Sequence, residues 1–183
     1  IIRGLVGSEM CIRDSVGIIN ALGTGVADDK AVYSYVNKMI VYYLGEQPIL
    51  NQVETFLCED KVHRQHVIEN ISKLVVKPAN ASGGYGIMIG PKAPKKEREE
   101  VIKKIKKNPR DFVAQPLEIL STTPTISENG IEPRHLDLRP FVLNGKSTYV
   151  TTGGLTRVAL RKGSTIVNSS QGGGSKDTMV VDT

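Results

Sequence analysis

Basic and glycine-rich positions recur in this sequence in an arrangement that suits a polyanionic ligand. Lys77 lies near the end of the apolar run LVVKP (74–78), so its aliphatic stem can pack while its ammonium reaches a cleft. A strand-end lysine that simply extends into solvent is the alternative. The loop that follows comprises Ser82, Gly83, Gly84, Tyr85 and Gly86. Its glycines let consecutive backbone N–H groups approach phosphate oxygens, unless the loop is a plain hairpin turn.

Two further features of this kind lie in the C-terminal part. Arg157 follows a Gly-Gly pair, and Asp137 and Arg139 lie on the strand before it. Asn168 precedes the segment QGGGSK (171–176), which supplies amide donors, backbone N–H groups and one cation, or else forms a flexible tail. Each feature alone is a weak signal, but all four in this order predict a site for a phosphate-bearing ligand.

Several other kinds of catalytic site lack the residues that they need. Gly145-Lys146-Ser147 is no P-loop, because Pro140 stands where the first glycine is required. In GYGIMIG (84–90) the third glycine comes one residue too late for a dinucleotide-binding motif. His63 and His66 could ligate a metal, but an exposed helix face is the simpler interpretation. No paired-cysteine zinc site or nucleophile elbow occurs.

The composition, with 39% hydrophobic and 23% charged residues over 183 positions, is that of a single globular domain. No apolar run approaches the roughly 18 residues that span a bilayer, so no membrane partner is expected. Two cysteines cannot form a disulfide framework, and we expect a cytoplasmic location. Residues 92–107 carry eight Lys or Arg and three Glu, which equals the net charge of +5 of the whole chain. A nucleic-acid-binding module is therefore a rival interpretation, although no aromatic platform interleaves with these cations.

Hydrophobic periodicity and turn signals predict the elements that must position these residues. Asp29 can cap a helix from Lys30 to about Leu44, and Asn144-Gly145 predicts the turn of a hairpin over 135–154. The remaining pattern predicts strands at 53–58, 74–78, 87–90 and 111–120, helices at 60–71 and 92–107, and a loop at 121–132. The expected fold class is α+β with an antiparallel sheet.

Seven short motifs, in this order, closely resemble those of the circularly permuted ATP-grasp proteins of type 2. This resemblance implies a glutathionylspermidine-synthase-like ligase. The motifs are DK (29–30), VVKP (75–78), SGGYG (82–86), AQP (114–116), DLRPFV (137–142), GGLTRVAL (153–160) and NSSQGGGSKDT (168–178). The resemblance extends from Val16 to the C-terminus. It implies a partial ATP-grasp fold, with a lid and nucleotide-binding subdomain over about 27–120 and part of the core sheet over about 131–183. It also implies an ATP-dependent ligase that joins a carboxylate to an amine or thiol through an acyl phosphate.

The resemblance further implies roles for particular residues. Those that would bind ATP are Lys30, Lys77, Ser82, Gly83, Gly84, Tyr85, Gly86, Gln115, Leu117, Glu118 and Lys176. The lysines and the glycine loop would hold the phosphates, while residues 115–118 would contact adenine and ribose at a hinge. Arg157 would stabilise the transferring phosphoryl group, and Asn168 would lie over the acceptor side. Asp137 and Arg139 could take part in catalysis or form a buried ion pair that holds their strand.

ATP-grasp proteins bind Mg²⁺ through an Asp and a Glu-x-Asn sequence, and no Glu-x-Asn occurs in this chain. Residues 1–15, IIRGLVGSEMCIRDS, resemble a translated sequencing adaptor. We therefore expect the metal ligands on a missing upstream segment, and we expect this chain by itself to be inactive. The implied partners are ATP, a carboxylate and an amine or peptide acceptor. A non-catalytic relative of the family is the alternative.

Overall fold

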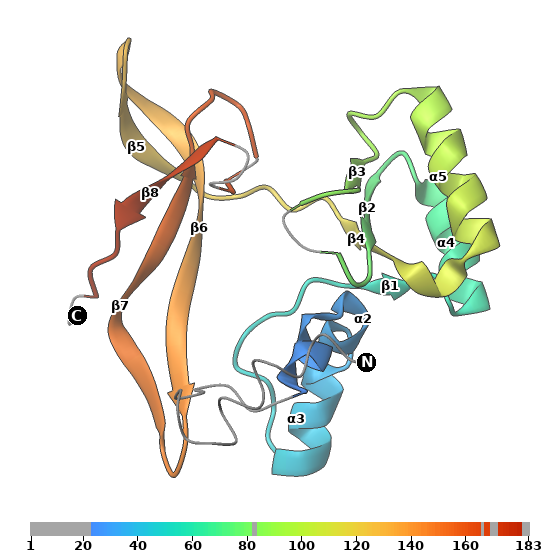
Figure 1. Ribbon diagram of the computed structural model, residues 1–183, viewed down its shortest axis with the longest axis horizontal. Helices are drawn as coiled ribbons and strands as arrows, with labels where there is room; N and C mark the ends of the chain where they lie inside the picture. The colour runs from blue at the N-terminus through green and yellow to red at the C-terminus, as the bar shows by residue number, and fades with distance from the viewer. Residues whose placement is uncertain (1–22, 82–83, 166, 169–171, 181–183) are drawn as a thin grey trace, which may run out of the picture. The chain divides into compact units, whose positions relative to one another are not determined.

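The computed structural model describes residues 23–81, 84–165, 167–168 and 172–180, which form two compact units (Figure 1). The first unit contains the described residues up to Ala81 together with Met88–Pro116. The second contains the described residues of 82–87 and of Leu117–Thr183. Each unit has its own four-stranded antiparallel sheet, and helices occur in the first. The predicted α+β class with antiparallel sheets is confirmed.

The first unit begins with three short helices, η1 (Thr24–Asp28), α2 (Lys30–Tyr33) and α3 (Val36–Leu44). The predicted helix over 30–44 is therefore interrupted at Ser34, whose hydroxyl donates to the carbonyl oxygen of Ala31 at 2.7 Å. Such side-chain bonds to the preceding turn compete with helical geometry. The predicted end is confirmed: Gly45 follows α3 with φ of 67°, a left-handed conformation that glycine adopts without strain.

The sheet of the first unit has the order β1-β4-β2-β3, and helices α4 and α5 pack against it. Its strands are β1 (Phe56–Leu57), β2 (Leu74–Pro78), β3 (Met88–Ile89) and β4 (Phe112–Pro116). The helices are α4 (Lys61–Asn70) and α5 (Lys95–Lys107), and the 3₁₀ turn η2 (Pro109–Asp111) leads into β4. Val67 of α4 and Ile105 of α5 are fully buried in one core with Val76 and Ala114. These elements lie where the sequence predicts them, although β1 and β4 are shorter than 53–58 and 111–120.

The second unit is a sheet of order β5-β6-β7-β8. Its strands are β5 (Thr122–Ser127), β6 (Gly130–Asn144), β7 (Thr148–Ala159) and β8 (Gly173–Asp177). The predicted hairpin is confirmed, because Asn144 pairs with Thr148 across the turn.

The predicted loop over 121–132 is wrong, because β5 and the start of β6 occupy most of it. Pro124 pairs with Pro133 in this ladder, and neither residue has an N–H to donate. Pro124 lies on the edge strand, and Pro133 lies before β6 begins to pair with β7 at Leu136. A proline is disfavoured in the middle of a sheet, but it is tolerated on an edge strand or where a strand is not paired on its other side.

Candidate functional site

The alternation of β2 and β4 places Lys77 and Gln115 on one face of the first sheet. Val76 and Ala114 point into the core shared with α4 and α5, so their neighbours along each strand point to the opposite face. Val75 lies opposite Gln115, and Lys77 lies opposite Val113. Lys77 and Gln115 are therefore diagonal neighbours, close enough for long side chains to meet.

Lys77 and Gln115 do meet, and Lys30 lies near them. Lys77 Nζ donates to Gln115 Oε1 at 2.6 Å, and Lys30 Nζ donates to the backbone oxygen of Ala81. Burial of Lys77 lowers the pKa of its ammonium, and the charge of Lys30 lowers that pKa further. Among the described residues, no carboxylate forms an ion pair with either lysine. The structure thus brings two cations together and gives both of them neutral acceptors.

The start of α2 is anchored so that Lys30 reaches this position. The backbone N–H of Lys30 donates at 2.8 Å to the carbonyl oxygen of Ala79, the residue that directly follows β2. Asp29 caps α2 by accepting from the Ala31 N–H, and it accepts from Arg110 at 2.8 Å through its other oxygen. The hydrogen bond from Arg110 is the main cause of the lowered pKa of Asp29. Arg110 is absent from every predicted site, since its partner lies 81 residues away in the sequence.

The glycine loop is described only in part. Ser82 and Gly83 lie outside the described residues. Gly84 and Gly86 have φ of 81° and 72°, so both adopt the left-handed conformation that the loop composition favours. Tyr85 between them is 70% exposed. These loop residues group with the second unit rather than with the unit that carries Lys30 and Lys77.

The residues predicted to contact adenine and ribose lie at the end of β4. Gln115 is part of the strand, whereas Leu117 and Glu118 follow it and are exposed. The boundary between the two units falls between Pro116 and Leu117. The side chain of Gln115 has a contact that the sequence does not reveal: its Nε2 donates to Thr55 Oγ1 at 2.8 Å.

In the second unit, Arg157 is held by Asp137 and Asn168. Asp137 on β6 lies opposite Arg157 on β7, and Arg157 Nε donates to Asp137 Oδ1 at 2.8 Å. A second guanidinium nitrogen bonds the other carboxylate oxygen, and the third bonds Asn168 Oδ1. This pairing lowers the pKa of Asp137 and raises that of Arg157. The ion pair of Asp137 thus joins two strands through Arg157, while Arg139 is exposed.

Lys176 lies apart from this group. Ser175 of β8, not Lys176, lies opposite Arg157, so Lys176 projects from the other face of the sheet. There its ammonium donates to the backbone oxygen of Pro124 on β5. The part of QGGGSK at 171 lies outside the described residues. The structure therefore brings together Arg157 and Asn168 but does not bring Lys176 to them.

A polar cluster that the sequence does not single out fastens β5 and β6. Arg134 is 6% exposed and donates to Glu132 Oε2 at 2.7 Å and to the Leu160 carbonyl at 3.1 Å. Glu132 also accepts from Ser127 and Lys162, and these three hydrogen bonds, with that from Arg134 the strongest, lower its pKa to about 2. Every side chain in the cluster has a partner, as expected of a group that stabilises the sheet.

No metal site is found among the described residues: no three of their His, Cys, Asp and Glu side chains gather around a common point. His63 Nδ1 accepts the Leu57 N–H at 3.2 Å, and the ring of His66 packs on Phe56 with centroids 4.6 Å apart. Both histidines thus hold α4 against β1. The described residues do not fit the Mg²⁺ that the family resemblance implies.

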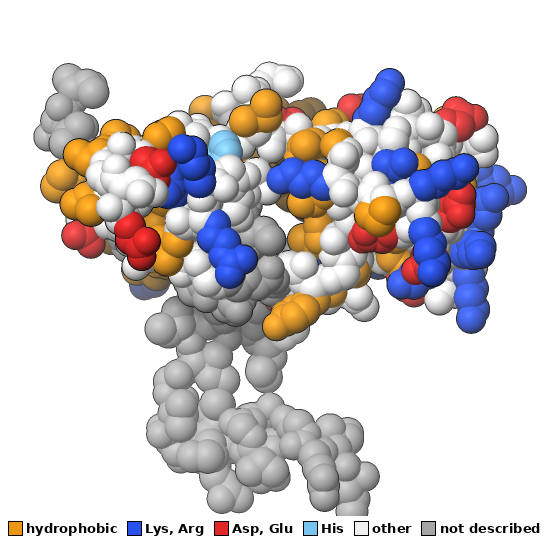
Figure 2. Space-filling model, turned by 90° about the horizontal axis from the view of Figure 1, so that it is seen from above, with side chains coloured by type: hydrophobic (Ala, Val, Ile, Leu, Met, Phe, Trp, Pro, Cys, Tyr) orange, Lys and Arg blue, Asp and Glu red, His pale blue; other side chains and the backbone are white. Residues whose placement is uncertain are grey.

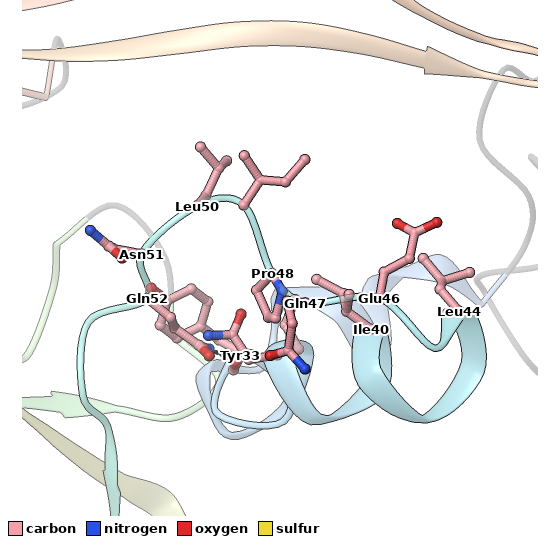
Figure 3. Close-up of a pocket in the computed structure, with 12 residues that line it drawn as sticks. Tyr33, Ile40, Leu44, Glu46, Gln47, Pro48, Leu50, Asn51 and Gln52 are labelled. Atoms are coloured by element: carbon pink, nitrogen blue, oxygen red, sulfur yellow. Dashed lines mark hydrogen bonds between the residues drawn. The ribbon is translucent and has the colours of Figure 1, made fainter.

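Two surface features of the first unit differ from the lysine pair. A cavity of about 550 Å³ lies between α3 and the segment 46–52 (Figure 3). None of the described residues that line it is Lys or Arg, so it does not suit phosphate. Lys and Arg side chains of α5 form an exposed basic surface interspersed with acidic groups (Figure 2). Lys95 and Glu99 are one such pair on this helix. No helix in the described part of the chain is long and apolar enough to cross a bilayer.

Comparison with known proteins places this arrangement in a family. The family model described as circularly permuted ATP-grasp type 2 matches residues 2–159, which includes most of the segment 1–15. The interpretation of that segment as adaptor-derived stays a prediction.

Three relatives illustrate the similarity. An uncharacterized protein of Synechocystis is 54% identical over 94% of this chain, and an uncharacterized protein of Mycobacterium tuberculosis is 50% identical over 98%. A Frankia casuarinae protein named "Putative glutamate--cysteine ligase 2-2" is 52% identical over 90%. The chain spans 36%, 32% and 19% of the lengths of these relatives. On the strength of the family match, the chain belongs to the circularly permuted ATP-grasp type 2 family.

Proposed function

We propose that this chain is the ATP-binding portion of an ATP-dependent ligase. The observation that carries the proposal is the pair of lysines in the first unit. Lys30 and Lys77 lie close enough for the charge of one to lower the pKa of the other, and both ammonium groups rest on neutral acceptors. Among the described residues neither half-buried ammonium has a carboxylate ion-pair partner, and Asp29 next to Lys30 is itself paired with Arg110. A polyphosphate would supply the negative charge that the two lysines lack.

The neighbouring backbone supports phosphate binding at this position. Lys30 is at the start of α2 and docks on the segment 79–81, which leads directly into the glycine loop. From the family resemblance, we propose Lys30, Lys77 and the loop 82–86 for the phosphates of ATP, and residues 115–118 for the adenine and ribose. In the second unit, Lys176 projects from the face of the sheet opposite to Arg157 and bonds the backbone oxygen of Pro124. This contact argues against Lys176 as a direct phosphate ligand.

The reaction that we propose proceeds in two steps. A carboxylate oxygen attacks the γ-phosphorus of ATP, which forms an acyl phosphate and releases ADP. An amine or thiol then attacks the acyl carbon, which forms the amide or thioester, loses a proton and releases phosphate. We propose that Arg157 stabilises the transferring phosphoryl group, because Asp137 and Asn168 fix the orientation of its guanidinium. Unlike Lys77, Arg157 is ion-paired with a carboxylate, and its remaining N–H groups form no hydrogen bond to the described residues.

The substrates are proposed by chemical class only: a carboxylate and an amine or peptide acceptor. The name of the Frankia relative points to ligation of an amino acid, but the matching segment is 19% of that protein, so the name need not describe it. Amide ligation, as in the glutathionylspermidine-synthase-like comparison, remains our preferred chemistry. No step above is assigned to a metal ion, because the described residues do not gather ligands for one.

The ligase proposal can be tested on the full-length Synechocystis relative, of which this chain covers 36%. ADP release would be measured with ATP and a panel of amino acids and short peptides, with and without hydroxylamine. We expect that any carboxylate that stimulates ADP release also yields a hydroxamate, since hydroxylamine intercepts an acyl phosphate. Stimulated ADP release without hydroxamate would exclude the acyl-phosphate route.

A further inference from the structure

Thr55 lies just before β1 and bonds to two groups through its hydroxyl. Thr55 Oγ1 donates to the Val53 carbonyl oxygen at 3.0 Å and accepts from Gln115 Nε2 at 2.8 Å. A hydroxyl has one hydrogen, and here that hydrogen is directed at Val53. Toward Gln115, Thr55 can therefore act only as an acceptor.

This constraint and the ammonium of Lys77 favour the same orientation of the Gln115 amide. The NH₂ group must point to Thr55, so the carbonyl oxygen, Oε1, points to Lys77 and accepts its ammonium at 2.6 Å. The reverse orientation would set the NH₂ group against the ammonium, with two donors facing each other, and would leave Thr55 facing a carbonyl oxygen without a hydrogen to offer. Lys77 and Thr55 thus favour the same orientation of the amide, with Thr55 holding its NH₂ end and Lys77 its oxygen.

We infer that Thr55 is a positioning residue for Lys77, acting through the side chain of Gln115. This inference rests on the proposed function, in which Lys77 binds a phosphate of ATP. The three side chains come from separate segments, and all three are half-buried on the same sheet face. The hydrogen bonds from Thr55 through Gln115 orient the ammonium of Lys77. Because the amide of Gln115 is neutral, the charge of the ammonium stays available for a ligand.

The inference predicts a difference between two substitutions at one position. Thr55→Val keeps the shape and removes the hydroxyl, whereas Thr55→Ser keeps the hydroxyl and removes a methyl group. Titration of the 183-residue chain with ATP should give an affinity about three- to tenfold lower for Thr55→Val, the loss expected for one oriented hydrogen bond. Thr55→Ser should bind ATP as wild type does, and adenosine should bind all three proteins equally. Thr55→Ala replaces Thr55→Val if the valine variant is not folded by circular dichroism.

A double-mutant cycle with Lys77→Met separates this inference from the proposed function. If Thr55 acts through Lys77, then Thr55→Val has no further effect on ATP affinity once Lys77 is methionine. Wild-type affinity in Thr55→Val, equal losses in Thr55→Val and Thr55→Ser, or additive losses in the cycle would overturn the role of Thr55. Wild-type ATP affinity in Lys77→Met alone would overturn the phosphate assignment of Lys77 itself.

Discussion

Replacing Gln115 by glutamate changes the charge beside Lys77 while preserving the shape of the side chain. In the wild-type protein, the ammonium of Lys77 bonds a neutral amide oxygen at 2.6 Å. In Gln115→Glu a carboxylate oxygen would occupy this position and form a charge-assisted hydrogen bond, roughly twice as strong as the neutral one. The pKa of Lys77 should rise. The carboxylate cannot donate to Thr55 Oγ1 as Gln115 Nε2 does, so the free energy of unfolding should change by less than the gain at Lys77 alone.

Binding of ATP should nevertheless weaken, because the new carboxylate neutralises the Lys77 ammonium that would otherwise bind a phosphate. A phosphate oxygen bonded to the same ammonium would lie roughly 5 Å from the carboxylate. At an effective dielectric constant of about 20, two like charges at that distance repel by about 3 kcal/mol. Allowing for partial screening, a loss of about 2 to 3 kcal/mol corresponds to a Kd raised roughly 30- to 150-fold.

The assay is calorimetric titration of the 183-residue chain with ATP, together with urea unfolding to confirm that the variant is folded. Gln65→Glu is the matched control, because it adds the same charge at an exposed position of α4, where Gln65 bonds only Glu69 among the described residues. The control should bind ATP like the wild type. Equal ATP affinity in Gln115→Glu and Gln65→Glu would refute the reasoning that an unneutralised Lys77 binds phosphate.

Three further predictions concern the two units. A Cβ on Gly90 would lie 2.0 Å from the carbonyl oxygen of Ile71, so Gly90→Ala should destabilise the first unit by about 3 kcal/mol in urea unfolding, whereas Gly145→Ala, with open space around it, should not. Ile105→Ala removes a fully buried side chain and should cost about 2 to 5 kcal/mol in the same assay. The pKa of Glu132 falls from 4.5 to about 2 on folding, so its contribution is complete above pH 4.5 and is lost as the pH falls toward 2. The stability difference between wild type and Glu132→Gln should therefore shrink over that interval, and a constant difference would contradict the assignment.

Elements with strong local signals are predicted well from this sequence. The Asn144-Gly145 hairpin, the cap at Asp29 and the helices at 61–70 and 95–107 all follow from turn chemistry, capping and periodicity. The strand β5 is not predicted, because Pro124 argues against a strand. Such a proline is compatible with an edge strand, but the sequence does not show that β5 lies at the edge of its sheet.

The candidate site divides in the same way. Lys30, Lys77 and Arg157 are identified by motifs, since their sequence neighbours carry the signal. Thr55, which we infer to position Lys77, and Arg110, which bonds the Asp29 cap beside Lys30, carry no such signal. Their partners lie 60 and 81 positions away, and only the folded sheet brings these groups together. The sequence also does not show whether the ammonium groups of Lys30 and Lys77 bond neutral or charged acceptors, because that depends on the folded structure.

The most direct test of the lysine-pair account is the ATP affinity of Lys77→Met compared with that of Lys95→Met. Each substitution removes one positive charge from the first unit, but Lys95 lies exposed on α5, where it forms a 4.0 Å ion pair with Glu99. We predict that Lys77→Met weakens ATP binding at least tenfold, the effect of losing a charge-assisted bond to phosphate of about 1.5 to 3 kcal/mol, and leaves adenosine binding unchanged. Lys95→Met should bind both ligands as wild type does. Equal ATP affinities for the two variants would contradict the assignment of this site to the phosphates of ATP.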